Sequence, residues 1–98
     1  MACTKKEIVD FLIKNKDSFQ QEFTVRRIGL FGSYARDEAI DESDIDIVVE
    51  LEKADMFYLI GIKLALEEKF GRRVDVVRIR KPMNMSLRRR IEKDAIYV

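Results

Sequence analysis

The sequence predicts a small α/β (α+β) domain in which helices pack against a mixed β-sheet. Three short runs of β-branched and apolar residues indicate strands, and segments with helical spacing of apolar residues separate them. A chain of 98 residues can bury one hydrophobic core. We therefore expect one domain that spans residues 1–98.

The first part of the chain predicts a helix, a linker and a strand. Thr4 followed by Glu7 has the form of a capping box, and apolar residues at helical spacing predict a helix over 4–15. The polar stretch 15–23 predicts a linker with room for a short helical turn. The β-branched run 25–31 ends at a glycine and predicts the first strand.

The middle of the chain predicts a brief helix over 33–38, a strand over 45–51 and a longer helix over 56–70. Asp55 can cap the longer helix and Gly71 can end it. The apolar positions of this helix spread over more than one stripe. This spread indicates either full burial or an interface with a partner, and we expect an interface on some surface of the chain.

The last part of the chain predicts a strand over 73–79, a break at Pro82 and a helix over 85–96 with a basic centre. Helices and strands thus alternate along the chain. The pattern does not predict the order of the strands in the sheet.

Composition limits the classes of function. Hydrophobic residues make up 47% and charged residues 38% of the chain, and a net charge of +1 gives no strong field that attracts nucleic acid or a membrane. No apolar run approaches the ~20 residues that cross a bilayer, and the N-terminal segment lacks a signal-peptide core, so we expect a cytoplasmic protein. Cys3 is the only cysteine, which excludes an internal disulfide.

Two aspartates alternate with isoleucines in the second predicted strand. Side chains alternate between the faces of a strand, so Asp44 and Asp46 point one way while Ile45 and Ile47 point the other. Neighbouring carboxylates repel, and partial burial makes them costly to keep ionised. A divalent cation would resolve both costs. The alternative is the solvated face of an edge strand, where charges discourage aggregation.

Asp75 lies between apolar residues in the third predicted strand and adds a third carboxylate. Carboxylates on neighbouring strands, with open positions for water and phosphate oxygens, suit Mg²⁺ in phosphoryl-transfer enzymes. The alternative is an ion pair between Asp75 and one of three arginines, Arg72, Arg73 or Arg78.

A glycine and a serine, Gly32 and Ser33, follow the first predicted strand. Glycine lets the backbone approach a ligand closely, and a helix that starts just after it presents free N–H groups and its positive dipole end to an anion. A serine hydroxyl can donate a hydrogen bond to a phosphate. The alternative is a plain turn with Ser33 as a helix N-cap. Together with the aspartates, the turn predicts a site for a metal-bound triphosphate.

These motifs resemble a known family. The segments "FGSYAR", "SDIDIVV" and "VDVV" are similar to the nucleotidyltransferase core of the DNA polymerase beta superfamily, and the closing "RRRIEKDAIYV" resembles minimal nucleotidyltransferases. Many of these are antitoxins of HEPN/MNT toxin–antitoxin pairs. The resemblance covers about residues 25–98 and implies a fold like the polymerase beta palm.

The resemblance implies a role for each matching residue. Gly32 and Ser33 would bind the phosphates of ATP. Asp44 and Asp46 would ligate Mg²⁺, and Asp75 would complete the acidic set at the metal and assist deprotonation of the acceptor hydroxyl.

Other residues near the motif carry weaker expectations. Arg36 occupies the place of a basic residue near the phosphates in related sequences. Asp37 stands where many relatives have glycine, so its charge would either weaken nucleotide binding or cap the brief helix. Tyr34 would either contact the nucleotide or pack. The basic clusters 78–81 and 88–90 would either bind RNA or nucleotide phosphates or form solvated faces and partner contacts, and we favour the second.

The resemblance implies a Mg²⁺-dependent nucleotidyltransferase that moves AMP from ATP to a tyrosine of a cognate HEPN ribonuclease toxin. Two alternatives stay open. One is an antitoxin that inhibits its toxin by binding alone, and the other is nucleotidyl transfer to a small molecule. The sequence does not predict the base preference, the number of AMP groups added or the oligomeric state.

Overall fold

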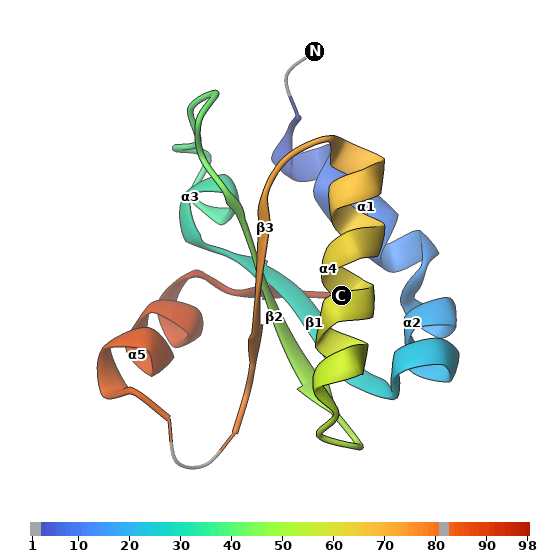
Figure 1. The fold of residues 1–98 in the computed structure, drawn as a ribbon. Coiled ribbons are helices and arrows are strands. Elements are labelled where there is room, and N and C mark those ends of the chain that lie inside the picture. Colours follow the sequence, from blue (N-terminus) through green and yellow to red (C-terminus); the bar gives the residue numbers. More distant parts are fainter. Residues whose placement is uncertain (1–2, 81–82) are drawn as a thin grey trace.

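The computed structural model describes residues 3–80 and 83–98 and shows a four-stranded mixed sheet with helices on both faces (Figure 1). This confirms the predicted fold class. In chain order the elements are α1 (Lys5–Lys14), α2 (Lys16–Phe23), β1 (Val25–Phe31), α3 (Gly32–Ala35), β2 (Ile45–Leu51), α4 (Met56–Phe70), β3 (Val74–Arg78), α5 (Met85–Asp94) and β4 (Ile96–Tyr97).

The sheet has the strand order β3-β2-β1-β4. β1 is antiparallel to both β2 and β4, whereas β2 and β3 are parallel and are joined by the crossover helix α4. In this register Asp46 faces Phe31 on one side and Asp75 on the other. The end of β1 and the beginnings of β2 and β3 therefore meet at the same end of the sheet.

Two cores lie on the two faces of the sheet. On one face, α1, α2 and α4 cover β2 residues such as Ile45, Ile47 and Val49 (Figure 1). On the other face, α5 covers a smaller group formed by Phe31, Val48 and Ile91. The alternation predicted for β2 is confirmed.

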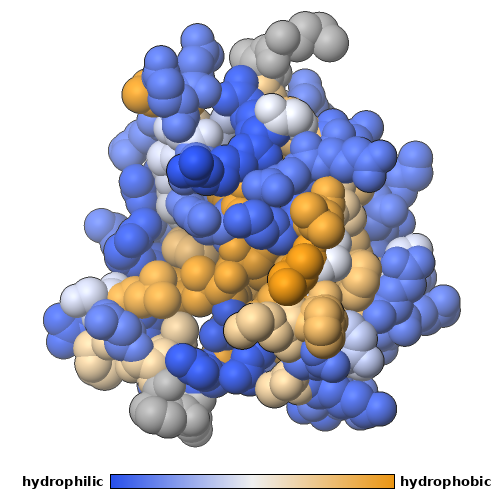
Figure 2. All heavy atoms as spheres, viewed as in Figure 1, coloured by the Kyte–Doolittle hydropathy of each residue, from blue (hydrophilic) through white to orange (hydrophobic). Residues whose placement is uncertain are grey.

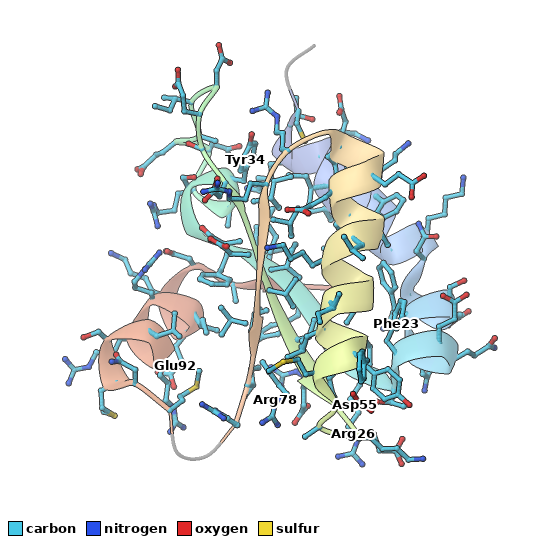
Figure 3. All side chains as sticks on the ribbon, viewed as in Figure 1. Phe23, Arg26, Tyr34, Asp55, Arg78 and Glu92 are labelled. Carbon is cyan, nitrogen blue, oxygen red and sulfur yellow. The ribbon has the colours of Figure 1, made fainter. Side chains whose placement is uncertain are left out.

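The stretch 15–23, predicted as a linker, is the regular helix α2, so this prediction is wrong. Phe19 and Phe23 lie four residues apart and therefore share one face of the helix. Phe19 is buried against Phe11, with ring centroids 6.4 Å apart, and Phe23 lies 6.0 Å from Phe19. Figure 3 shows Phe23 beside the first half of α4, where its ring is 6.4 Å from that of Tyr58. Burial of the two phenylalanines thus stabilises α2, although the polar sequence of this stretch did not predict a helix.

The last helix ends at Asp94 and not at residue 96, and the chain continues as the short strand β4 beside β1. This close approach depends on Gly29, because a Cβ there would lie 2.8 Å from the carbonyl oxygen of Ile96. A strand of two residues has no alternation to detect, and its partner lies far away in the sequence.

The predicted helix caps are confirmed. Thr4 Oγ1 accepts a hydrogen bond from the N–H of Glu7 (3.2 Å), Asp55 Oδ1 accepts one from the N–H of Phe57 (2.8 Å), and Gly71 ends α4 at a positive φ of 62°.

The boundaries of three elements differ slightly from those predicted. The first helix and the third strand are each one residue shorter at both ends than predicted, and the brief helix covers Gly32–Ala35 and not 33–38. The predicted break at Pro82 lies outside the described residues. None of the described helices has the length and hydropathy that crossing a membrane requires.

Candidate active site

Asp46 and Asp75 lie side by side on parallel strands, in register, at the end of the sheet where β1 stops. β2 is an inner strand, so the edge-strand interpretation of Asp46 is wrong. Asp75 is exposed and forms no salt bridge within residues 3–80 and 83–98, so the proposed pairing with a nearby arginine is also wrong for that part of the chain. Two unpaired carboxylates thus share one surface.

The turn after β1 lies directly against this pair. Gly32 has a φ of 75°, and a Cβ at this position would overlap Oδ2 of Asp46 and lie 3.0 Å from its Cγ. Only a glycine lets the backbone both adopt this φ and approach the carboxylate. The glycine turn and the acidic pair are therefore parts of one site.

Ser33 lies inside α3 and is half-buried. The residue at the N-cap position is Phe31, so the interpretation of Ser33 as an N-cap is wrong. α3 has only four residues, and its dipole is correspondingly small. Any affinity of this turn for an anion must come from its backbone N–H groups and from the Ser33 hydroxyl.

A surface hollow of about 430 Å³ opens around this pair. Its lining comes from both faces of the sheet, because α4 contributes on one side of the edge strand β3 and α5 on the other. The lining residues are Phe31, Asp46, Leu59, Ile60, Lys63, Asp75, Val76, Val77, Leu87 and Arg90.

The hollow contains two cationic side chains, Lys63 and Arg90, that the sequence did not predict as site residues. Lys63 was not identified, although it is the one charged residue in the apolar run 56–66 of α4, and this isolation was the available signal. Arg90 was only counted as part of the basic cluster 88–90. Neither side chain forms a salt bridge with another described residue. Both positive charges are thus available to an anion in the hollow.

The electrostatics of Asp46 indicate that the nearby cations offset its negative charge only in part. Burial raises the pKa of the Asp46 carboxyl above its ordinary value, and the neighbouring Asp75 and Asp44 raise it further. Arg90 and Arg36 act in the opposite direction and lower this pKa. A divalent cation between the carboxylates would relieve the remaining cost of ionisation.

Asp44 precedes β2, is half-buried and does not line the hollow. Within residues 3–80 and 83–98, no three His, Cys, Asp or Glu side chains converge closely enough to hold a metal ion. The structure therefore brings Asp46 and Asp75 together, and the addition of Asp44 as a third ligand requires its carboxylate to turn toward them. The charge and oxygen chemistry of the pair fit Mg²⁺.

Arg36 connects the turn to α5. Its Nη1 lies 2.6 Å from Oδ2 of Asp94, which is only 6% exposed, and its Nε donates to Glu38 (3.0 Å). The guanidinium is thus held beside the site. Asp37 adopts a left-handed φ of 58°, a conformation that glycine adopts at lower cost, and its carboxylate lies 3.4 Å from Lys5 Nζ. It directly follows Arg36, the C-cap residue of α3, and its N–H donates to the carbonyl of Tyr34 (3.3 Å), as at the C-terminal end of many helices.

Tyr34 packs in the larger core and is 4% exposed, so the packing interpretation is the one that the structure confirms. Figure 3 shows its place at α3. Burial raises the pKa of its hydroxyl.

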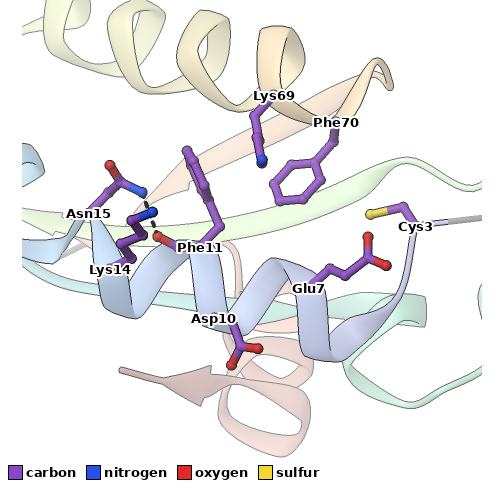
Figure 4. Close-up of a pocket in the computed structure, with 8 residues that line it drawn as sticks. All are labelled: Cys3, Glu7, Asp10, Phe11, Lys14, Asn15, Lys69 and Phe70. Carbon is purple, nitrogen blue, oxygen red and sulfur yellow. Dashed lines mark hydrogen bonds between the residues drawn. The ribbon is translucent and has the colours of Figure 1, made fainter.

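A larger hollow of about 610 Å³ lies between α1 and the end of α4, and neither Asp46 nor Asp75 lines it (Figure 4). Phe11 and Phe70 meet edge to face in its wall, with ring centroids 5.4 Å apart, and Lys69 lies over the Phe11 ring. Burial raises the pKa of the Cys3 thiol, which disfavours its reactive thiolate form. Size alone therefore does not identify the functional site, and we assign it to the smaller hollow.

Residues 12–98 match the family model of the nucleotidyltransferase domain. The chain belongs to the nucleotidyltransferase domain family. The protein adenylyltransferase MntA of Thermococcus cleftensis is 34% identical over 96 residues, which cover 97% of this chain and 96% of that protein.

Solved structures agree in fold. A minimal nucleotidyltransferase matches with a TM-score of 0.77 at 29% identity and covers 96% of this chain and 95% of its own. A chain of a toxin–antitoxin complex with AMP-PNP matches at a TM-score of 0.69, with 22% identity and coverage of 97% and 72%. A chain of the complex of a tri-AMPylated Shewanella oneidensis HEPN toxin with an MNT antitoxin matches at 0.59, with 21% identity and coverage of 95% and 66%.

Two glycines with a similar positive φ, 75° at Gly32 and 62° at Gly71, give a matched test of the contact with Asp46. Gly32→Ala and Gly71→Ala each place a side chain at a positive φ, which costs about 1–2 kcal/mol. The new Cβ at residue 71 meets nothing within 4 Å, whereas the one at residue 32 must displace Asp46. We expect Gly32→Ala to lower the free energy of unfolding by about 1 kcal/mol more, measured in urea. Equal losses would show that the contact is not tight.

The raised pKa of Asp46 predicts a stability that depends on pH. In the unfolded chain the carboxyl titrates near its ordinary value of 3.8, and in the folded chain it titrates at a higher pH. The protonated Asp46 carboxyl therefore favours the folded state. This contribution to the free energy of unfolding is complete at a pH below the pKa of the unfolded chain and is lost as the pH rises through the pKa of the folded chain. Without divalent cations, Asp46→Asn should therefore raise the melting temperature at pH 7 by several degrees and change it little below pH 3.8.

Asp41→Asn serves as the control, because Asp41 is exposed and lies outside the hollow. It should leave the melting temperature at pH 7 unchanged. A lower melting temperature for Asp46→Asn at pH 7 would contradict the assignment of unfavourable charge to this carboxylate.

Proposed function

We propose that this chain is a Mg²⁺-dependent protein adenylyltransferase that acts as an antitoxin. It transfers AMP from ATP to a tyrosine hydroxyl of a cognate HEPN ribonuclease toxin and thereby inactivates it. The observation that carries the proposal is the glycine turn packed directly against Asp46, with Asp75 in register beside it. Phosphates at the turn and a metal at the carboxylates would be neighbours.

Each residue has a place in the chemistry. The tyrosine oxygen forms a bond to the α-phosphorus, the bond from that phosphorus to the β-phosphate oxygen breaks, and pyrophosphate leaves. Gly32 and Ser33 bind phosphate oxygens, and Asp75 receives the proton of the hydroxyl. Bound Mg²⁺ neutralises phosphate charge and polarises the reacting phosphoryl group, and Asp46, Asp44 and Asp75 would hold it.

The cations of the hollow complete this assignment. Lys63 and Arg90 enter the same hollow as Asp46 and Asp75, and both are free to neutralise charge on the triphosphate. Arg36 is held by Asp94 and Glu38, so its contribution is a fixed positive field beside Asp46. Such preorganised charge is the main source of catalysis in phosphoryl transfer.

The names of the similar proteins support a protein as the acceptor of AMP. One is named as a protein adenylyltransferase, and a structural neighbour contains a tri-AMPylated HEPN toxin with an MNT antitoxin. The hollow lies at the surface beside the edge strand β3, so a large acceptor can reach it. The position of the hollow and the transfer chemistry are therefore both compatible with an acceptor side chain on another protein.

The test combines the chain, its cognate HEPN toxin, ATP and Mg²⁺, followed by intact-mass analysis. We expect the toxin to gain mass in whole AMP units, and the gain to disappear when Mg²⁺ is chelated. Asp44→Asn/Asp46→Asn should reduce the rate at least about 100-fold, because it removes the charges that align the reacting groups. Asp41→Asn is the matched control and should retain the full rate.

Peptide mapping of the modified toxin then identifies the acceptor residue. Modification of a residue other than tyrosine would contradict that part of the proposal. Inhibition of the toxin without any gain in mass, and without ATP, would instead favour the antitoxin that acts by binding alone.

A further inference from the structure

α4 is apolar on two opposite faces. Its inner face is buried against the sheet through residues such as Ile62 and Leu66. Its outer face carries four of the eight large apolar side chains that are exposed in the described part of the chain. These four residues, Met56, Phe57, Ile60 and Leu64, are here called the α4 stripe.

The α4 stripe is a continuous surface. Positions 56, 57, 60 and 64 fall within one side of a helix at 3.6 residues per turn, and they extend over about 12 Å at 1.5 Å per residue. Phe57 is 80% exposed and Leu64 is 58% exposed. Figure 2 shows apolar side chains gathered over α4 and across the middle of this face toward α5. An exposed apolar surface of this kind is typical of a protein interface.

The stripe adjoins the candidate active site. Ile60 belongs to the stripe and also lines the hollow of Asp46 and Asp75. Across the site the order is the Gly32 turn, then Asp46, then Asp75 on the edge strand β3. If the phosphates bind at the Gly32 turn, the space beside Asp75 remains open for the acceptor. α4 borders this space.

We propose that the α4 stripe is the docking surface for the protein that carries the acceptor hydroxyl, a proposal that rests on the proposed function. This partner is the HEPN toxin, and it places an apolar surface on the stripe so that its tyrosine reaches Asp75. A second copy of this chain on the stripe would instead cover the edge of the hollow and obstruct the acceptor. Aromatic and methionine side chains such as Phe57 and Met56 are enriched in interfaces of this kind.

The test is a double variant, Phe57→Ser/Leu64→Ser, which leaves the hollow untouched because neither residue lines it. We expect the Kd for the toxin to rise at least about 30-fold, as for the loss of a central apolar anchor. The rate of AMP transfer at toxin concentrations below the Kd should fall in proportion. Binding of a non-hydrolysable ATP analogue by the chain alone should be unchanged, and so should the melting temperature.

The matched control is Ile13→Ser/Ile40→Ser, because Ile13 is 57% and Ile40 66% exposed and neither residue belongs to α4 or lines the hollow. This control should bind the toxin as the unmodified chain does. Unchanged toxin binding by Phe57→Ser/Leu64→Ser would overturn the proposal. So would light scattering that shows a dimer of the chain alone and a monomer of this variant, since the stripe would then bind a second copy.

The two proposals fail in different ways. Toxin binding that depends on the stripe, without AMP transfer, would support the docking surface and contradict the adenylyltransferase function. AMP transfer that the stripe variant leaves unchanged would support the function and contradict the docking surface.

Discussion

The contact between the backbone of Gly32 and the carboxylate of Asp46 is the constraint on which the rest of the site depends. It requires a residue without a side chain at a positive φ, directly after β1. It also requires β2 to present a carboxylate toward that turn, which the antiparallel register of β1 and β2 provides. The parallel pairing of β2 with β3 then adds Asp75 on the far side. Turn, first carboxylate and second carboxylate thus follow one another across neighbouring strands.

The same arrangement has an energetic cost. Asp46 is partly desolvated beside two other carboxylates, and the nearest positive charges, on Arg90 and Arg36, offset this cost only in part. A fold selected for stability alone would place an apolar or neutral side chain at this position. The proposed function accounts for this unfavourable charge, because a bound cation would offset it. Functional sites commonly carry such strain.

The sequence predicted the parts of the fold that depend on local pattern. The strands 25–31 and 45–51 and the caps Thr4, Asp55 and Gly71 followed from alternation, turn residues and side-chain hydrogen bonds. The alternation in β2 also predicted that Asp46 points away from the larger core.

What the sequence did not predict depends on contacts between distant residues. α2 is held by aromatic packing, and β4 depends on space left by Gly29. Lys63 becomes part of the site only because the crossover brings α4 beside the edge strand β3. The two apolar faces of α4 also became distinguishable only once the sheet was seen to cover one of them. The sequence spacing grouped Asp44 with Asp46, but only the structure shows that Asp44 does not line the hollow.

The Gly32 turn and the two in-register aspartates are proposed to form a single site for a metal-bound nucleotide. The most direct measurement is nuclear magnetic resonance with Mn²⁺ and a non-hydrolysable ATP analogue, because Mn²⁺ broadens the signals of nearby amides. The account predicts selective broadening at Gly32, Ser33, Asp46 and Asp75. Selective broadening around the larger hollow between α1 and α4, or none that depends on the nucleotide, would contradict it.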